Sequence, residues 1–127
     1  LARRNKILGI ADKIPLQEID LGDSEGDLAV VGWGSTYGSI NQAVLSIREQ
    51  GYKVSHIHVR NIWPLPSNFK DLLSGFKKIL VPELNTGQLL TIIRAEYLAN
   101  ARGLNKVAGK PFRISEVEHA IKQCLES

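Results

Sequence analysis

The chain of 127 residues has one cysteine, no methionine and few aromatic side chains. A single cysteine, Cys124, excludes an intramolecular disulfide framework and favours a reducing compartment, so we expect a cytoplasmic protein. We interpret Cys124 as a small apolar side chain on the last helix rather than as a reactive thiol. The absence of methionine from a chain that begins with Leu1 indicates a piece of a longer polypeptide.

Long hydrophobic runs are also missing. The apolar runs are far shorter than the roughly 20 residues that a membrane span requires, and no signal-peptide pattern opens the chain. We therefore expect a soluble protein without a membrane partner. The length suits a single domain, residues 1–127, that buries one core of its own.

A strong charge of one sign is absent as well. The net charge is +3, and the positive side chains are spread along most of the chain. Aromatic residues are not interleaved with them in the way that a single-strand binder requires. We therefore expect no nucleic-acid partner.

What the sequence does contain is organised around LAVVGWGSTYG, residues 28–38. Four consecutive aliphatic residues predict a central strand buried on both faces, which implies a parallel sheet covered by helices. The glycines that follow indicate a tight turn into a helix, whose backbone N–H groups suit an anion or a polar partner. The spacing has one residue too many for G-x-G-x-x-G and lacks the P-loop lysine, so an ordinary strand-to-helix turn is favoured.

Helices and strands alternate along the rest of the chain, which predicts an open α/β sheet with right-handed connections. Leu16–Leu21 alternates with period two and predicts an edge strand. The other predicted elements are a helix at 39–50, a strand at 53–59, a short helix capped by Ser67, a strand at 78–81, a helix at 88–101, a strand at 105–108 and a last helix with a capping box at 115–118.

Four polar loops follow the predicted parallel strands, at 32–38, 58–66, 83–88 and 109–112. In an open α/β sheet, ligands and partners meet the carboxyl ends of the parallel strands. We therefore expect any functional surface to lie at that edge of the sheet.

Some residues of these loops have more than one interpretation. His56 and His58 share one face of a strand, but a metal needs a third ligand and His119 lies far along the chain, so structural histidines are favoured. Arg60 suits an acidic substrate or the phosphates of a ligand, although a local salt bridge is the more common role. Loop 83–88 fits either a ligand site or a turn with an N-cap.

The sequence resembles a known family over nearly the whole chain. The resemblance rests on five blocks in this order: GWGSTYGSI, HVRNIWPLP, VPELNTGQLL, IRAEYL and KVAGKPF. The sequence resembles the carboxyl-terminal domain of the alpha subunit of 2-oxoacid:ferredoxin oxidoreductases, most closely the 2-oxoglutarate (KorA-type) branch. The resemblance implies a fold like the transketolase carboxyl-terminal domain, a three-layer α/β/α sandwich on a mixed five-stranded sheet with one antiparallel edge strand. Leu16–Leu21 would be that edge strand, and residues 1–14 would be a linker from a missing upstream domain.

By this resemblance, the parent enzyme oxidises a 2-oxoacid, forms acyl-CoA from it and CoA, and passes the electrons to ferredoxin. Its cofactors would be thiamine diphosphate, Mg and iron–sulfur clusters. The chain has neither a Gly-Asp-Gly…Asn thiamine-binding segment nor a Cys-x-x-Cys array. The resemblance therefore implies that an upstream thiamine-pyrimidine domain and a beta subunit carry the cofactors, and that this chain has no catalytic, cofactor-binding or metal-binding residue of its own.

If other parts of the enzyme carry the cofactors, the role that remains for this chain is docking to neighbouring domains and positioning them. The candidate contact residues are Gly34, Ser35, Thr36, His58, Arg60, Glu83, Asn85 and Gln88. A competing hypothesis is a free-standing anion-binding or nucleotide-binding α/β domain that uses the loop Gly32–Ser39.

Overall fold

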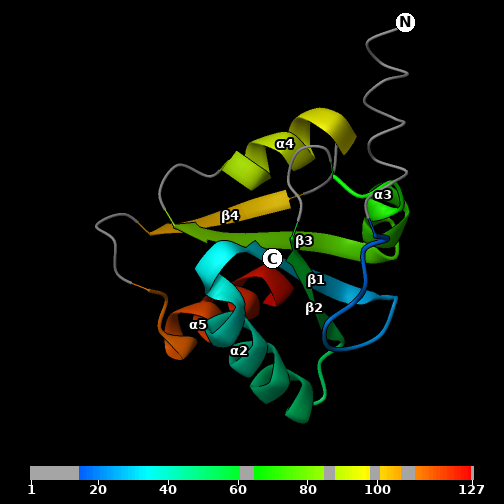
Figure 1. Ribbon diagram of the computed structural model, residues 1–127. Coiled ribbons are helices and arrows are strands. Elements are labelled where there is room, and N and C mark those ends of the chain that lie inside the picture. Colours follow the sequence, from blue (N-terminus) through cyan, green and yellow to red (C-terminus); the bar gives the residue numbers. More distant parts are fainter. Residues whose placement is uncertain (1–14, 61–64, 85–87, 98–100, 107–110, 127) are drawn as a thin grey trace, which may run out of the picture.

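The computed structural model describes residues 15–60, 65–84, 88–97, 101–106 and 111–126. Four parallel strands form one sheet in the order β2-β1-β3-β4, and helices cover both of its faces (Figure 1). The strands are β1 (Gly26–Trp33), β2 (Val54–Val59), β3 (Phe76–Leu84) and β4 (Ala101–Lys106). The helices are the 3-10 turn η1 (Gly34–Thr36), α2 (Tyr37–Glu49), α3 (Phe69–Leu73), α4 (Gln88–Tyr97) and α5 (Ile114–Glu126).

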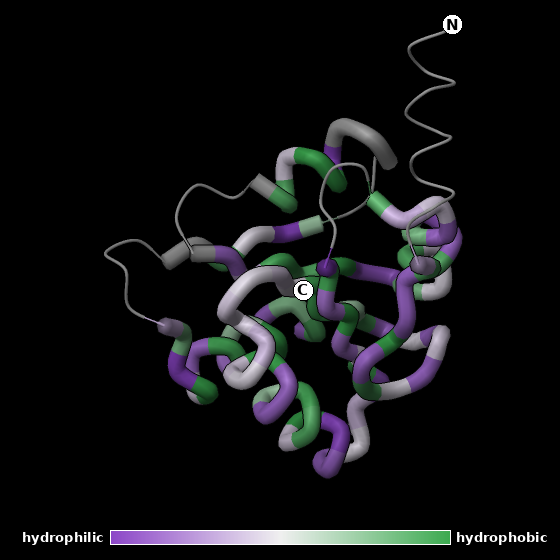
Figure 2. Tube along the Cα trace, in the orientation of Figure 1, coloured by the Kyte–Doolittle hydropathy of each residue, from purple (hydrophilic) through white to green (hydrophobic). Residues whose placement is uncertain are grey.

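β1 is the centre of the fold, as its aliphatic run predicts. Leu28, Ala29, Val30 and Val31 are all fully buried. Alternate side chains of this run enter different cores: Leu28 and Val30 pack with α2 and α5, whereas Ala29 and Val31 pack with α3 and α4. Hydrophobic segments accordingly gather between the helix layers (Figure 2). The predicted three-layer α/β/α sandwich is therefore confirmed.

The prediction of a fifth strand at Leu16–Leu21 is wrong. In the part of the chain that the structure describes, the sheet has four strands, all parallel. The segment makes a single antiparallel bridge, between Leu21 and His56. In this bridge Asp20 N and Leu21 N donate to His56 O, and His56 N donates to Leu21 O. The segment therefore lies where an antiparallel edge strand was expected, but it does not continue the ladder.

Side chains explain why the ladder stops. The Gln17 backbone N–H donates to Asn68 Oδ1 at 2.7 Å and its carbonyl accepts from Asn68 Nδ2 at 2.9 Å, so this backbone is paired with the start of α3. Beyond the bridge to His56, the contacts towards β2 come from side chains: Gln17 Nε2 donates to His58 O at 2.8 Å, and His58 N donates to Asp20 Oδ1 at 2.7 Å. A period-two pattern marks alternating faces, but it does not show whether backbone or side chains make the hydrogen bonds.

Several predicted boundaries differ from the observed ones. The strand predicted at 105–108 begins earlier, at Ala101, so that Gly103 lies inside β4 and pairs with Val81. The N-cap of α3 is Asn68 rather than Ser67. At the start of α5, Arg113 N donates to Glu116 Oε1 at 2.9 Å, two residues before the predicted start of the capping box. The predicted linker, residues 1–14, lies outside the described residues and stays a prediction.

We expect Gly32→Ala to destabilise the fold by about 1 to 3 kcal/mol, because a Cβ at this point would clash with the Ile40 side chain and lie 2.9 Å from Thr36 Oγ1. Gly38→Ala is the matched control. A Cβ at Gly38 meets nothing within 4 Å, and alanine is the better helix former. Urea unfolding of both variants measures the difference, and equal stability would contradict the packing described for Gly32.

Candidate functional site

The sheet has a topological switch point at the carboxyl ends of β1 and β3. From β1 the chain passes through η1 and α2 to β2, and from β3 it passes through α4 to β4, on the other side of the sheet. The two helices cover opposite faces (Figure 1). Ligands and partners of open α/β sheets meet the crevice at such a point.

The turn after β1 presents small residues to solvent. Gly34 has φ +69°, a left-handed conformation that glycine adopts without strain. Thr36 Oγ1 donates to Trp33 O at 2.9 Å, and Thr36 is buried. Gly34 and Ser35 are exposed. Of these three candidate residues, Thr36 therefore holds the turn together, and the other two are available for contact.

Glu83 lies at the end of β3, with its carboxylate turned into the protein. It is 1% exposed, and its Oε2 accepts from Trp33 Nε1 at 2.6 Å. The same carboxylate accepts from Leu89 N at 2.8 Å and from Leu90 N at 2.9 Å, at the start of α4. Glu83 thus caps α4 with a favourable negative charge and joins the two sides of the switch point.

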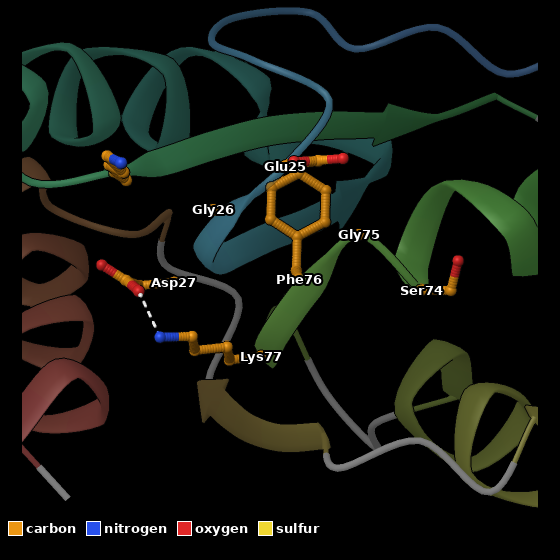
Figure 3. A pocket seen from close by; sticks show the side chains of 8 residues that line it. Glu25, Gly26, Asp27, Ser74, Gly75, Phe76 and Lys77 are labelled. Carbon is orange, nitrogen blue, oxygen red and sulfur yellow. Dashed lines mark ion pairs between the residues drawn. The ribbon is translucent and has the colours of Figure 1, made fainter.

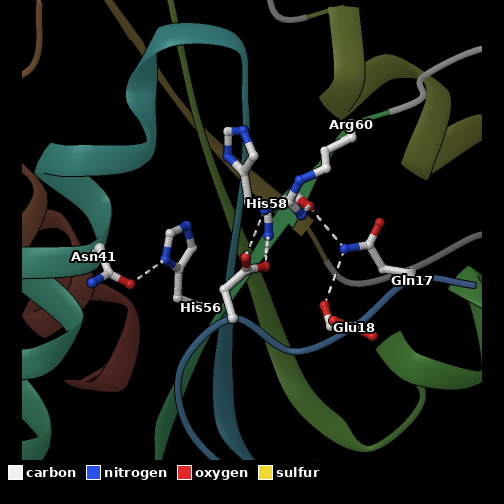
Figure 4. Close-up of polar contacts among 7 residues, drawn as sticks. Gln17, Glu18, Asn41, His56, His58 and Arg60 are labelled. Carbon is white, nitrogen blue, oxygen red and sulfur yellow. Dashed lines mark hydrogen bonds and ion pairs between the residues drawn. The ribbon is translucent and has the colours of Figure 1, made fainter.

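The end of β2 is tied to the segment that precedes β1 (Figure 4). Arg60 Nη2 forms an ion pair with Asp20 Oδ2 at 3.2 Å, and Arg60 Nη1 donates to His58 O at 3.2 Å. The Arg60 side chain remains 63% exposed, whereas that of Asp20 is 10% exposed. Arg60 therefore has the local salt bridge that was the favoured interpretation, and its outer surface still faces solvent.

His56 and His58 form an aromatic cluster with Tyr37. The Tyr37 ring centroid is 5.1 Å from each imidazole centroid, and the two imidazole centroids are 6.2 Å apart. Burial lowers the pKa of His56 to about 4 and also lowers the pKa of His58, and the charge of Arg60 acts in the same direction on both. Both rings are therefore neutral at neutral pH.

The hydrogen bonds of this cluster are incomplete within the described part of the chain. His56 Nδ1 lies 3.0 Å from Asn41 Oδ1, an acceptor, so Nδ1 carries the proton (Figure 4). His56 Nε2 and His58 Nδ1 have no hydrogen-bond partner among the described residues. The same residues contain no group of three His, Cys, Asp or Glu side chains that could hold a metal ion. Both imidazoles lie against the Tyr37 ring.

The structure brings six of the eight sequence candidates to the ends of neighbouring strands. Asn85 lies outside the described residues, and Gln88 begins α4 without a described side chain. Sequence reasoning missed Asp20 and Tyr37. No local signal identifies Asp20, whereas an aromatic residue inside a glycine-rich turn was a signal for Tyr37.

Two pockets lie away from the switch point. A pocket of about 370 Å³ opens at the amino ends of β1 and β3, where Lys77 pairs with Asp27 at 3.4 Å (Figure 3). A second pocket of about 250 Å³ lies beside Arg60 and is lined also by Pro15, Leu16, Gln17, Glu18 and Pro66.

Among the described residues, no helix has the length and apolar character to cross a membrane.

This geometry defines a doubly wound α/β domain with an exposed turn at the carboxyl end of the central strand of its parallel sheet. Comparison with known proteins then identifies the family. Residues 26–118 match the family described as pyruvate:ferredoxin oxidoreductase core domain II, and the chain belongs to that family. The resemblance noted in the sequence is confirmed.

Individual relatives agree with this assignment. The chain is 37% identical over 123 residues to the 2-oxoglutarate oxidoreductase subunit KorA of Mycobacterium tuberculosis, a match that covers 97% of this chain and 18% of the relative. The chain also matches a solved structure, the 2-oxoglutarate:ferredoxin oxidoreductase from Magnetococcus marinus with 2-oxoglutarate, coenzyme A and succinyl-CoA bound. The TM-score is 0.86 and the sequence identity is 29%, and the match covers 97% of this chain and 22% of that one. The chain thus spans about a fifth of the length of these proteins.

The transketolase-like fold is also confirmed. A split-gene transketolase structure matches with a TM-score of 0.64 at 16% identity, over 87% of this chain and 41% of that one. At this level of identity the likeness concerns the fold alone.

We expect Glu83→Gln to destabilise the protein by about 2 kcal/mol. The neutral amide has one acceptor oxygen in place of two, which leaves a buried backbone N–H of α4 unpaired. Glu18→Gln is the control, because Glu18 is exposed and its loss is expected to change stability by less than about 0.5 kcal/mol. Urea unfolding measures both variants, and equal effects would contradict the role assigned to Glu83.

We also expect the protein to lose stability on acidification. The pKa of His56 is about 4 in the folded protein, against 6.5 for an unperturbed histidine, so the unfolded chain binds more protons between these values. The contribution of His56 to the free energy of unfolding is complete above about pH 6.5, and it falls by about 3 kcal/mol as the pH approaches about 4.

Unfolding free energies at a series of pH values measure this loss. His56→Gln removes the titrating group and is expected to flatten the pH dependence. An equally steep dependence in this variant would show that other groups cause the acid sensitivity.

Proposed function

We propose that this chain is the carboxyl-terminal docking and positioning domain of the alpha subunit of a thiamine-diphosphate-dependent 2-oxoacid:ferredoxin oxidoreductase. The complete enzyme would form acyl-CoA from a 2-oxoacid and CoA and pass electrons to ferredoxin. Membership of the core domain II family supports this proposal, and the similarity to KorA and to the Magnetococcus marinus enzyme supports 2-oxoglutarate as the oxoacid. We also infer a cytoplasmic location, which the single cysteine supports.

The chain lacks the cysteine ligands of an iron–sulfur cluster, and the start of α4 is not open to a diphosphate. An iron–sulfur cluster is held by several cysteine thiolates, and the chain has one cysteine. A diphosphate suits the N-terminus of a helix, but at α4 the Glu83 carboxylate already accepts from the backbone N–H groups of Leu89 and Leu90. Thiamine diphosphate, Mg and the clusters would therefore be held by the upstream thiamine-pyrimidine domain and the beta subunit.

The closed switch point is the observation that carries the docking role. Trp33 Nε1 donates to Glu83 Oε2 at 2.6 Å, so the two sides of the crevice are bonded to each other. Beside this closed crevice, Gly34, Ser35 and Arg60 remain exposed. An edge that offers exposed turns beside a closed crevice suits contact with other protein better than a small ligand.

The competing function, anion or nucleotide binding at Gly32–Ser39, also has one observation in its favour. The first residues of η1 and α2 have no side-chain cap, since neither Trp33 nor Thr36 provides one. Backbone N–H groups at a helix start can bind phosphate. Titration of the chain with CoA, thiamine diphosphate and adenine nucleotides separates the two functions.

We expect replacement of Asn85 and Gln88 by alanine to weaken assembly of the complete enzyme and to lower its 2-oxoglutarate-dependent reduction of ferredoxin in proportion. The reason is that both residues follow β3 at the proposed contact edge. Sedimentation velocity and a ferredoxin-reduction assay provide the measurements. Lys53→Ala, at the opposite edge of the sheet, is the control and is expected to assemble normally.

Two outcomes would contradict this function. Unchanged assembly and turnover in the Asn85 and Gln88 variant would remove these residues from the contact. Micromolar binding of CoA or a nucleotide by the chain, measured by calorimetry, would favour the anion-binding function instead.

A further inference from the structure

β4 forms one edge of the sheet, and its backbone is exposed there. The strand order β2-β1-β3-β4 places β4 beside β3 alone among the described strands (Figure 1). Gly103, in the middle of β4, pairs with Val81 of β3 and is nevertheless exposed. A glycine has no side chain, so this exposed surface belongs to the main chain. The edge of β4 therefore offers main-chain groups to solvent.

A contact from α4 shows which backbone groups of β4 point outwards. Arg94 Nε and Arg94 Nη2 both donate to Ala101 O, at 3.1 and 2.8 Å. A carbonyl oxygen has two lone pairs, so Ala101 O has none left for a ladder bond to β3. Alternate residues of a strand direct their N–H and C=O groups to the same side. The N–H and C=O of Gly103 therefore point away from β3, as Ala101 O does.

The position of Gly103 inside a strand needs an explanation of its own. A glycine there weakens the strand, and it often marks a bulge or the close approach of another backbone. The register excludes a bulge, because the pairing of β4 with β3 continues without interruption from Ala101 to Lys106. Close approach of another backbone is the explanation that suits an exposed sheet edge.

The charged residues of β4 are both cations, Arg102 and Lys106. Arg102 is exposed. It lies on the face of the sheet that α2 and α5 cover, because Leu104 packs against the core of that face and Ala101 belongs to the core of the other. The β4 edge is therefore basic on the side of α5.

A second cation lies on the same face. Lys78 Nζ donates to Cys124 O, on α5, at 2.8 Å. Burial raises the pKa of the Cys124 thiol, and the charges of Arg102 and Lys78 act against this effect, so both cations lie near the thiol. An acidic strand would bring opposite charge to this side of the edge. A second copy of β4 would bring like charge, which disfavours pairing between two copies.

We propose that the outer edge of β4 binds an extended, acidic polypeptide segment as an additional strand. Main-chain hydrogen bonds to Gly103 would pair the segment with β4, and carboxylates at alternate positions of the segment would meet Arg102. Arg94 already occupies Ala101 O, so pairing would begin at Gly103. This activity goes beyond the proposed function, because it uses a side edge of the sheet rather than the carboxyl ends of its strands.

Peptide probes of six residues, the length of β4, test the proposal on the chain itself. A peptide of alternating valine and glutamate is expected to bind saturably in the millimolar range, to shift the Gly103 amide signal in NMR spectra and to slow its hydrogen exchange. A peptide of alternating valine and lysine is expected to bind at least about 10-fold more weakly. The glutamate peptide with N-methyl groups at alternate residues is the control, because it keeps the charge but loses main-chain donors.

Variants of the chain test the two parts of the contact separately. Arg102→Glu is expected to weaken binding of the glutamate peptide about 10-fold and to strengthen binding of the lysine peptide. Lys70→Glu, an exposed position on α3, makes the same change of charge and is expected to bind like the wild type. Gly103→Pro removes the outward N–H, at an edge where proline is tolerated, and is expected to abolish binding. Thermal unfolding checks that each variant is folded.

Three results would overturn the proposal. They are no saturation by the glutamate peptide up to about 10 mM, equal binding of its N-methylated form, and equal binding of the lysine peptide. A dimer of the chain that Gly103→Pro dissociates would assign the edge to a second copy and overturn the acidic partner. Assembly and ferredoxin reduction by the complete enzyme test the proposed function separately, so either proposal can fail while the other stands.

Discussion

The buried carboxylate of Glu83 is the group on which the carboxyl edge of this domain depends. A charge that is 1% exposed is tolerated in a protein interior when hydrogen bonds replace the lost water. Here the donors are the indole of Trp33, on β1, and the first backbone N–H groups of α4. One side chain thus fixes the start of a helix, the orientation of an aromatic ring and the closure of the switch point.

The outer edge of β2 shows a second use of polar groups. Asp20, Leu21 and Gln17 satisfy the backbone of His56 and His58 by a mixture of main-chain and side-chain hydrogen bonds. An edge strand whose N–H and C=O groups are already paired does not recruit another strand. At His56 and His58 this edge is therefore not open to pairing with a strand of another protein.

In the proposed function, a widespread fold serves an enzyme through docking. The same layered α/β architecture appears in a split-gene transketolase at 16% identity, where the likeness is one of fold. In this chain a hydrogen bond between Trp33 and Glu83 joins the ends of β1 and β3 at the switch point, where such folds often bind a ligand. Beside this bond the edge exposes Gly34, Ser35 and part of the Tyr37 ring, which supports the proposed docking role.

The sequence by itself determined the fold class, the central strand and the inner face of α2, because the periodicity of apolar residues reports local burial directly. Its motifs also identified the family. Only the tertiary structure decided that Leu16–Leu21 is tied to β2 by both main-chain and side-chain hydrogen bonds, that Glu83 points inwards, and that Tyr37 lies against two histidines. Those contacts join residues far apart in the sequence, such as Trp33 with Glu83 and Asp20 with His58, and local patterns carry no information about which distant partner a polar side chain meets.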